Sequence, residues 1–451
     1  MTDATASGAV PSGAGQGSLL AKDQRTAKRN AAEGRFKIYG LIAVCIGIAA
    51  LVLLLTSILT SGLSAFRQTT IAMQVTLDAE RLDPSGVRDY DAMAKVTTFG
   101  YAPLLRDGLQ ATIAAAGIET ELDPGDAMEL ISDESVAQLR NRVLNNPDLI
   151  GQTIEVNVLA SGRIDGFYKG RVSYASAELD SNISPEQLQL AEALEERGAL
   201  KTGLDWRFLT APDASDTRPE AAGLGVAIIG SAYMMLIVLV LALPIGVAAS
   251  IYLEEFAPQN RWTDLIEVNI SNLAAVPSIV FGILGLAIFI NFAGLPQSAP
   301  IVGGLVLTLM TLPTIIIATR AALKAVPPSI RDAALGLGAS KMQSVFHHVL
   351  PLAMPGILTG TIIGLAQALG ETAPLLLIGM VAFVREYPDT PLDGGFFDPA
   401  TALPVQVFNW TQRSDPAFVE RASGAIIVLL AFLLLMNLTA IFLRRRFERR
   451  W

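Results

Sequence analysis

The chain has 451 residues, of which 51% are hydrophobic and only 17% are charged. These values exclude a wholly soluble protein and indicate an integral membrane protein with a substantial soluble part. The single cysteine, Cys45, excludes an intramolecular disulfide. The net charge of -9 is uneven: residues 66–222 hold 26 acidic and 14 basic side chains, a net of -12, which leaves +3 for the remainder of the chain.

The N-terminal part of the chain is predicted to be a tail followed by a membrane span. Residues 1–37 are rich in Ala, Gly and Ser and then basic, with too little apolar content to fold, so we expect a disordered tail. Residues 38–63 are mostly apolar and exceed the ~20 residues that cross a bilayer. A cleavable signal peptide has a shorter apolar core nearer the start, so we expect an uncleaved first transmembrane helix.

Residues 66–222 have the composition of a soluble domain inserted after this span, and we expect a mixed α/β fold. Apolar residues alternate with polar ones from Ile71 to Leu77 and from Ile154 to Val158, which predicts strands. Ser184-Pro185-Glu186-Gln187 predicts the start of a helix that continues to about Leu200. The segment has no metal-ligand cluster, nucleophile motif or phosphate-binding loop, and its acidic residues are expected to form a solvated surface.

Five further apolar runs predict a six-span membrane protein with a five-helix core at residues 223–443. The runs cover residues 224–251, 271–293, 301–319, 355–380 and 422–443. Six spans place both termini on one side, and the basic N-terminal tail and basic C-terminal tail (444–451) assign that side to the cytoplasm. The insert at 66–222 is then expected to face outward and the polar stretch 320–351 to face inward.

The stretch from Arg320 to Pro351 is polar and basic although it joins two apolar runs. Its helix-start, turn and helix-stop residues follow in series: Ser329 with Asp332, then Gly336 and Gly338, then Ser340 with Gln343, and finally Pro351. The pattern predicts two short helices joined by a glycine turn, the second stopped at Pro351. A plain connector needs only a few polar residues, so we expect this stretch to dock another protein.

Glu371 is an acidic residue inside the apolar run 355–380. At ~1.5 Å per residue it falls beyond the bilayer midplane, where an ionised carboxylate is costly unless it is paired or hydrated. Two roles are open for Glu371: it lines a translocation pathway, or its carboxylate hydrogen-bonds a neighbouring helix. Pro374 leaves the carbonyl of Gly370 without its helical partner, which predicts a break or kink beside the acid.

Arg320 is a second candidate for the translocation pathway. The alternative is that its side chain only extends its charge to the membrane interface. His347 and His348 have no cysteine or acidic company, so we expect no metal site. The chain lacks the nucleotide-binding P-loop and dinucleotide fingerprints and the zinc-protease motif, so we expect no cofactor in it and no ATP hydrolysis by it. The energy for active transport would have to come from another subunit or from an ion gradient. The two short helices predicted at 329–350 favour another subunit.

The stretch 320–351 resembles the EAA loop of ATP-binding-cassette (ABC) importer permeases, and we call it the EAA segment. Asp332-Ala333-Ala334, Gly338 and Leu350-Pro351 stand where that family has Glu-Ala-Ala, Gly and Leu-Pro, with Asp for Glu and with His348 at a place that is normally apolar. The resemblance implies a type I permease fold and a contact with a cytoplasmic ATPase. The coupling residues implied are Ser329, Arg331, Asp332, Ala333, Ala334, Gly338, Ala339 and Ser340.

Further motifs in the membrane half resemble Pst-type phosphate permeases, in particular PstA-like subunits. They are Pro244 to Val247, Tyr252-Leu253-Glu254-Glu255, Val276 to Gly282 and Gly370-Glu371-Thr372-Ala373-Pro374. The resemblance implies a bacterial inner-membrane importer of inorganic phosphate and no nucleic-acid partner. The implied partners are a second, PstC-like permease, a PstB-like ATPase dimer that binds ATP and Mg, and a periplasmic PstS-like phosphate-binding protein. The insert resembles an extra N-terminal periplasmic domain of some members.

The predicted pathway residues are Glu371, Gln367, Thr372 and Arg320. Pst-type permeases often have Arg four residues before the Glu, on the same helix face, where this chain has Gln367. An Arg could meet a phosphate oxygen or neutralise the acid, whereas Gln can only hydrogen-bond. Either the partner permease or Arg320 then supplies the cation, or the anion does not stop at this subunit.

Three functions remain open at this point. The first is a phosphate permease, the second a permease for another oxyanion such as sulfate or molybdate, and the third a membrane sensor or scaffold that uses the insert. Spans broken by Pro and Gly, with an acid inside the membrane, are unnecessary for anchoring, so the sequence favours a permease.

Overall fold

The computed structural model describes residues 24–84, 86–380 and 383–447, and the chain divides between Ser57 and Ile58 into two compact units. Helix α1 (Gln24–Gly62) makes up the described part of the first unit and ends in the second. Its apolar side chains from Ile38 to Leu55 are exposed, as expected for a helix surrounded by lipid.

The expected disorder of the N-terminal tail is wrong for residues 24–37, which are helical, while residues 1–23 lie outside the described residues. The apolar run that follows nucleates the helix, and adding residues to an existing helix is far easier than starting one. An ion pair between Lys37 Nζ and Glu33 Oε1 (2.7 Å), one turn apart, supports the extension.

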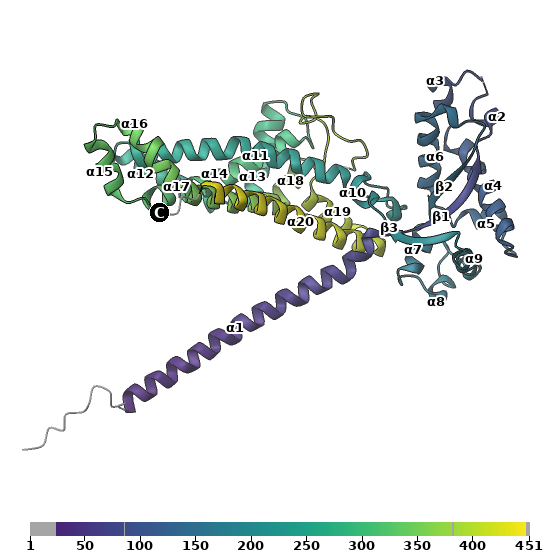
Figure 1. The fold of residues 1–451 in the computed structure, drawn as a ribbon, viewed down its shortest axis with the longest axis horizontal. Coiled ribbons are helices and arrows are strands. Elements are labelled where there is room, and N and C mark those ends of the chain that lie inside the picture. The colour runs from purple at the N-terminus through teal and green to yellow at the C-terminus, as the bar shows by residue number, and fades with distance from the viewer. Residues whose placement is uncertain (1–23, 85, 381–382, 448–451) are drawn as a thin grey trace, which may run out of the picture. The chain divides into compact units, whose positions relative to one another are not determined.

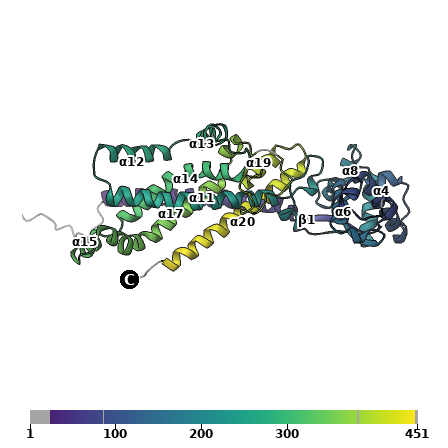
Figure 2. The ribbon, with the colours of Figure 1, turned by 90° about the horizontal axis from the view of Figure 1, so that it is seen from above.

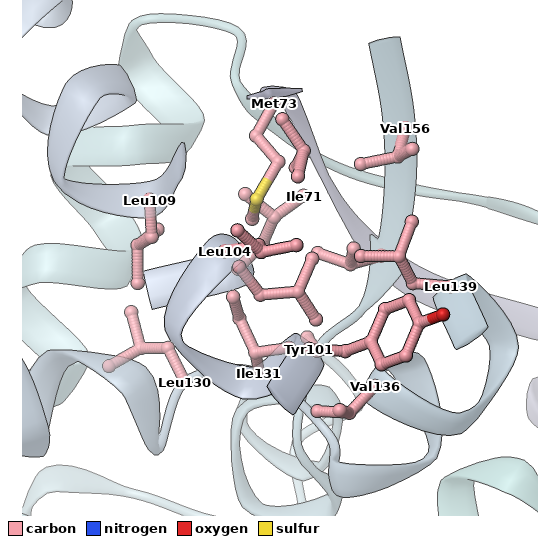
Figure 3. Close-up of a cluster of buried hydrophobic side chains, with 14 of the residues drawn as sticks. Ile71, Met73, Tyr101, Leu104, Leu109, Leu130, Ile131, Val136, Leu139 and Val156 are labelled. Atoms are coloured by element: carbon pink, nitrogen blue, oxygen red, sulfur yellow. The ribbon is translucent and has the colours of Figure 1, made fainter. Parts of the chain in front are cut away.

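Three antiparallel strands form the sheet of the insert, in the order β2-β1-β3 (Figure 1). They are β1 (Arg67–Thr76), β2 (Thr153–Leu159) and β3 (Leu200–Leu204). The predicted alternation is confirmed, since Ile71, Met73 and Val75 of β1 are buried and pair in register with strand β2. These side chains pack on Tyr101, Leu104 and Leu109 of helix α4 and on residues of helix α6 (Figure 3).

Short helices cover the sheet of the insert. Their bounds are α2 (Ala79–Leu82), α3 (Tyr90–Ala94), α4 (Thr98–Ala116), α5 (Pro124–Met128), α6 (Asp133–Asn145), α7 (Gly162–Tyr168), α8 (Tyr174–Ala177), α9 (Pro185–Glu196) and α10 (Arg207–Thr210). The predicted start of α9 is confirmed, because Ser184 and Gln187 form a reciprocal capping box. The helix ends at Glu196, before Leu200, where β3 begins.

The membrane core is built from helices that pack side by side in both views (Figures 1 and 2). Their bounds are α11 (Gly225–Ile251) with a π turn (Tyr252–Phe256), α12 (Arg261–Ala274), α13 (Ser278–Gly285) with a π turn (Leu286–Phe292), α14 (Pro300–Lys324), α15 (Pro328–Gly336), α16 (Lys341–Ser344) with a π turn (Val345–Val349), α17 (Leu350–Gly370), α18 (Ala373–Leu377), α19 (Leu403–Gln412) and α20 (Pro416–Phe447). Gly304 permits close packing of α14 on α11, because a Cβ there would be 2.7 Å from Ile237 Cβ.

Among the described residues, five helices have the length and apolarity of a membrane span, and the count becomes six if one bent pair is a single span. The bent pair is α12 with α13 and its π turn, which meet at 101°. The predicted span at 271–293 is therefore interrupted at residues 275–277. Pro277 lacks the N–H that a continuing helix needs, and it restricts the residue before it, so the helix ends at Ala274 and a new one begins at Ser278.

Candidate functional sites of the membrane core

The EAA segment folds as two short helices joined at a glycine. Helix α15 ends in a Schellman motif, in which the N–H of Gly338 bonds the carbonyl of Leu335 and the N–H of Ala339 bonds that of Ala334. Gly338 has a φ of 86°, a left-handed conformation that favours glycine. Ser340 and Gln343 form the predicted capping box at the start of α16.

Two details of the predicted EAA segment are wrong. Helix α15 begins at Pro328 without a side-chain cap, so Ser329 lies inside its first turn and does not start it. The second helix does not stop at Pro351, because α16 continues through the π turn into α17 without a break. The N–H of Leu350 bonds the carbonyl of Val345 five residues earlier, and this wider turn accommodates the proline that follows.

Most of the predicted coupling residues lie on an exposed surface. Ser329, Asp332, Ala333, Gly338 and Ser340 are exposed, Arg331 and Ala339 are half-buried, and Ala334 is buried. Leu337 at 89% exposure and Met342 at 60% add apolar side chains to this surface, which is the composition of a docking site.

The Arg331 guanidinium is hydrogen-bonded to other residues of this chain. Its Nη2 lies 2.7 Å from Glu255 Oε1 and its Nε 3.0 Å from the same oxygen. Its other N–H groups donate to the carbonyls of Val326 (2.8 Å) and Leu323 (2.9 Å), at the C-terminal end of α14. A cation at these carbonyls satisfies acceptors that have no helical partner, so Arg331 fastens α15 to α14 and to the π turn after α11.

Arg320 is also paired within the core. Its Nη2 is 2.5 Å from Glu267 Oε1 on α12, and its Nε is 3.4 Å from Glu254 Oε2 on the π turn. Lys324 Nζ reaches the same Glu254 oxygen at 3.5 Å. We call the six charged residues of this region the joint cluster: Glu254, Glu255, Glu267, Arg320, Lys324 and Arg331.

The predicted break beside Glu371 is confirmed. Helix α17 ends at Gly370, Glu371 has an extended backbone (φ -79°, ψ 129°), and α18 begins at Ala373 with Pro374 in its first turn. Glu371 and Thr372 are half-buried, and Gln367, one turn earlier, is exposed. Within the described residues the Glu371 side chain makes no hydrogen bond or ion pair, while its backbone N–H donates to the carbonyl of Ala368. Of the four predicted pathway residues, three therefore gather at the break, while Arg320 belongs to the joint cluster.

The helices that follow the two breaks of the core, α13 and α18, are packed against each other. Gly282 of α13 lies against α18, and a Cβ added to it would be 2.7 Å from Pro374 Cα and 2.9 Å from the Pro374 carbonyl oxygen. Only glycine permits this approach, because both neighbours are backbone atoms. The bend at residues 275–277 and the break at Glu371 thus belong to one structural unit.

A second ion cluster, absent from the sequence predictions, joins the insert to α20. We call it the insert cluster: Asp165, Lys169, Arg171 and Glu420. Lys169 Nζ lies 2.7 Å from Asp165 Oδ2 and 3.0 Å from Glu420 Oε1, and Arg171 Nη1 lies 2.5 Å from Glu420 Oε2. Lys169 is 3% exposed, so solvent is almost excluded from its contacts with Asp165 and Glu420, and we call such a cluster dry.

Buried polar groups continue beside the insert cluster. Arg421 donates to Gln68 Oε1 and to the carbonyl of Glu220, both at 2.8 Å. The Glu220 side chain accepts from the Ser132 hydroxyl. Burial raises the pKa of the Glu220 carboxyl, while the Ser132 hydrogen bond and the charge of Arg421 oppose that rise.

The acidic residues of the joint cluster are also absent from the predicted sites. The sequence did contain a sign of this pairing. Glu254 and Glu255 follow one predicted span, Arg320 and Arg331 follow another, and both spans are predicted to end on the cytoplasmic side. Opposite charges at neighbouring helix ends are candidates for pairing. Which residues pair, however, depends on how the helices pack.

Several helices of membrane-spanning length, with a partly exposed acid at a break among them, are features of a membrane transport protein, because a simple anchor needs only one such helix and no acid within it. Residues 242–451 match the family described as binding-protein-dependent transport system inner membrane component. Residues 23–178 match a domain of unknown function, DUF3333.

Individual proteins agree with the family match. The chain is 33% identical over 249 residues to the probable ABC transporter permease protein YqgI of Bacillus subtilis, covering 52% of this chain and 82% of YqgI. It is 34% identical over 239 residues to the phosphate transport system permease protein PstA 2 of Mycobacterium bovis, covering 52% of this chain and 76% of that protein. A solved inward-facing structure of the MetNI methionine ABC transporter is 16% identical, covers 50% of this chain and 95% of its own, and has a TM-score of 0.38. The chain belongs to the ABC-importer permease family, as a PstA-like member with an extra N-terminal domain.

Proposed function

We propose that the chain is the transmembrane permease subunit of an ATP-driven importer of inorganic phosphate and forms half of its translocation pathway. The observation that carries the proposal is the break at Glu371, where a half-buried carboxylate without a described partner lies beside the second helix break. Non-helical backbone at membrane depth is tolerated where it is buried in protein or lines a water-filled path.

Phosphate as the cargo is supported by the names of relatives such as PstA 2 and by the chemistry of an acid in the pathway. At neutral pH phosphate retains at least one O–H group, which can donate to the Glu371 carboxylate. Sulfate and molybdate are fully deprotonated at this pH and would meet the carboxylate with repulsion alone. A site built around a hydrogen-bond acceptor rejects a ligand that lacks the donor, so Glu371 favours phosphate over these competitors.

The partners follow from the family and from the exposed EAA segment. A PstB-like ATPase dimer, which binds ATP and Mg, would dock on the exposed face of α15 and α16, and a PstC-like permease would supply the other half of the pathway. A PstS-like binding protein would deliver the anion. With both termini in the cytoplasm, as the basic tails favour, the insert is periplasmic and the EAA segment is cytoplasmic.

The test is uptake of radiolabelled phosphate by cells that lack this subunit and carry either the wild-type chain or a variant. Glu371→Ala is expected to abolish uptake while the variant still co-purifies with the ATPase, because the pathway loses its acceptor but the EAA segment is unchanged. Glu386→Ala, which removes an exposed acid outside the break, is the matched control and should transport normally. Normal uptake by Glu371→Ala, or equal inhibition of uptake by excess sulfate and by excess unlabelled phosphate, would contradict the proposal.

A further inference from the structure

We propose that the π turn after α11 (Tyr252–Phe256) is the joint through which the EAA segment moves the helix break at Glu371, and that Glu254 and Glu255 are its positioning residues. This inference rests on the proposed function, since it concerns how ATP-driven motion reaches the pathway. It assigns a role to two adjacent carboxylates that the coupling residues and the pathway residues do not include.

Both helices of the EAA segment contact this one turn. Arg331 of α15 pairs with Glu255, which is only 7% exposed, and Lys341 at the start of α16 lies over the Phe256 ring at 5.4 Å from its centroid. The first contact is strong, because a buried carboxylate without its cation is costly, and the second is a cation–π contact. A displacement of the EAA segment therefore cannot leave the turn in place without breaking both contacts.

The neighbouring carboxylate connects the same turn to the core. Glu254 holds Arg320, and the Arg320 guanidinium also holds Glu267 on α12 at 2.5 Å. One guanidinium thus links the turn, α14 and α12. Because Glu254 and Glu255 are adjacent in the sequence, a rotation of the turn moves both Arg partners together.

From α12 the structure continues to the predicted pathway. Helix α12 bends by 101° into α13, and Gly282 of α13 is packed against the backbone of Pro374, three residues after Glu371. Packed backbones of this kind transmit a displacement, since no flexible side chain lies between them. The complete route is α15, Glu255, Glu254, Arg320, Glu267, α12, α13 and the break at Glu371.

The placement of the turn suits a joint. A π turn has wider hydrogen bonding than the α-helix, and such turns are frequent at functional sites. Here it closes with the N–H of Ala257 bonded to the carbonyl of Tyr252 at 2.7 Å. The contacts of Glu254 with Arg320 and Lys324 are partly exposed, so they exchange partners at lower cost than the buried Glu255–Arg331 pair.

The experiment is a double-mutant cycle in the assembled and reconstituted transporter: Glu255→Ala, Arg331→Ala and the double variant. We expect each single variant to assemble with the ATPase and to lower the phosphate moved per ATP hydrolysed on the order of tenfold, and the double variant to lose no more than Arg331→Ala alone, because both changes remove the same pair. Arg261→Glu, at an exposed arginine on α12, is the matched control and should leave the ratio unchanged. Unchanged ratios in both single variants, or losses that multiply in the double variant, would overturn the proposal.

A second measurement separates this inference from the proposed function. Spin labels at Leu335→Cys, an exposed residue of α15 outside the predicted coupling set, and at Val280→Cys on α13, in a Cys45→Ser background, report whether trapping ATP changes the distance between the two helices. We expect a change in the otherwise unaltered chain and none in the conservative variant Glu255→Gln. The same change in both would overturn the joint even if phosphate uptake is normal. If the transporter moves no phosphate but the distance changes in the unaltered chain and not in Glu255→Gln, the proposed cargo is wrong and the joint is supported.

Discussion

The two ion clusters differ in how far their members are removed from solvent. The insert cluster, which joins the insert to α20, is the drier: Asp165 is 2% exposed, Lys169 3% and Glu420 8%, and only Arg171 reaches 22%. The joint cluster, after the end of α11, is mixed: Lys324 is 59% exposed and Glu267 37%, whereas Glu255 is 7% exposed. Both clusters hold together segments that are far apart in the sequence.

The difference in burial assigns the clusters different tasks. A dry cluster resists change, because separating its members leaves a charge uncompensated in a medium that cannot hydrate it. A partly hydrated cluster can open and close, because water replaces a lost partner at small cost. The insert is therefore fastened rigidly to α20. In the joint cluster the buried Arg331–Glu255 pair is also hard to separate, whereas the exposed pairs of Glu267 and Lys324 are adjustable.

The largest effect is expected from Glu420→Ala in the insert cluster. This change takes Glu420 from Lys169 and Arg171, which keep only Asp165 at 2.7 and 3.5 Å, and breaking a buried pair costs about 3–5 kcal/mol of folding stability. Thermal unfolding of the purified protein in detergent measures the loss. Glu119→Ala, at an exposed acid of the insert, is the control and should shift stability by no more than about 0.5 kcal/mol. A loss no greater than that of the control would show that the dry cluster is not structural.

A smaller and salt-dependent effect is expected from Glu267→Gln in the joint cluster. Arg320 keeps Glu254, and a partly exposed pair contributes about 1 kcal/mol or less. Raising the ionic strength from about 0.1 M to about 1 M shortens the screening length from ~10 Å to ~3 Å, so the difference from wild type should shrink. The same unfolding assay at both salt concentrations checks this. A difference that is large and independent of salt would remove the contrast between the clusters.

The smallest effect is expected from Glu220→Gln beside the insert cluster. Burial raises the pKa of Glu220 in the folded protein above its unfolded value, so the folded state binds this proton more tightly. Its contribution to stability is then fully present below the unfolded pKa and is lost as pH rises through the folded pKa. Unfolding midpoints from about pH 4 to about pH 8 should therefore fall less steeply in Glu220→Gln than in wild type or in Glu119→Gln. Identical slopes in all three proteins would contradict the raised pKa.

Several elements could be predicted from the sequence because local chemistry decides them. The apolar run at 38–63 is helical, the alternation at Ile71, Met73 and Val75 gives β1, and Ser184 and Ser340 cap helices with Gln three residues later. The break at Glu371 could be predicted in the same way, from the missing N–H of Pro374 four residues after Gly370. In each case the interaction lies within a few residues of the chain.

Local rules failed where the outcome depended on neighbours. Pro351 should stop a helix, yet the π turn before it lets the helix continue, and Pro277 bends the predicted span 271–293 where Pro313 leaves α14 unbroken. A proline removes one hydrogen bond in every case. Whether the helix then bends or continues depends on whether adjacent turns and packed helices satisfy the groups it frees.

A helical membrane protein with an acidic α/β insert, a capped second helix in the EAA segment and an acid at a helix break could be predicted from the order of residues alone. Apolar length, alternation and capping are local or additive properties, so the linear order of residues is sufficient for them. The pairing of Arg320 and Arg331 with Glu254, Glu255 and Glu267, and the contact of Gly282 with Pro374, could be seen only in the folded chain. Charge pairing and backbone contact over such separations depend on how helices pack, and many different pairings are compatible with the same sequence of charges.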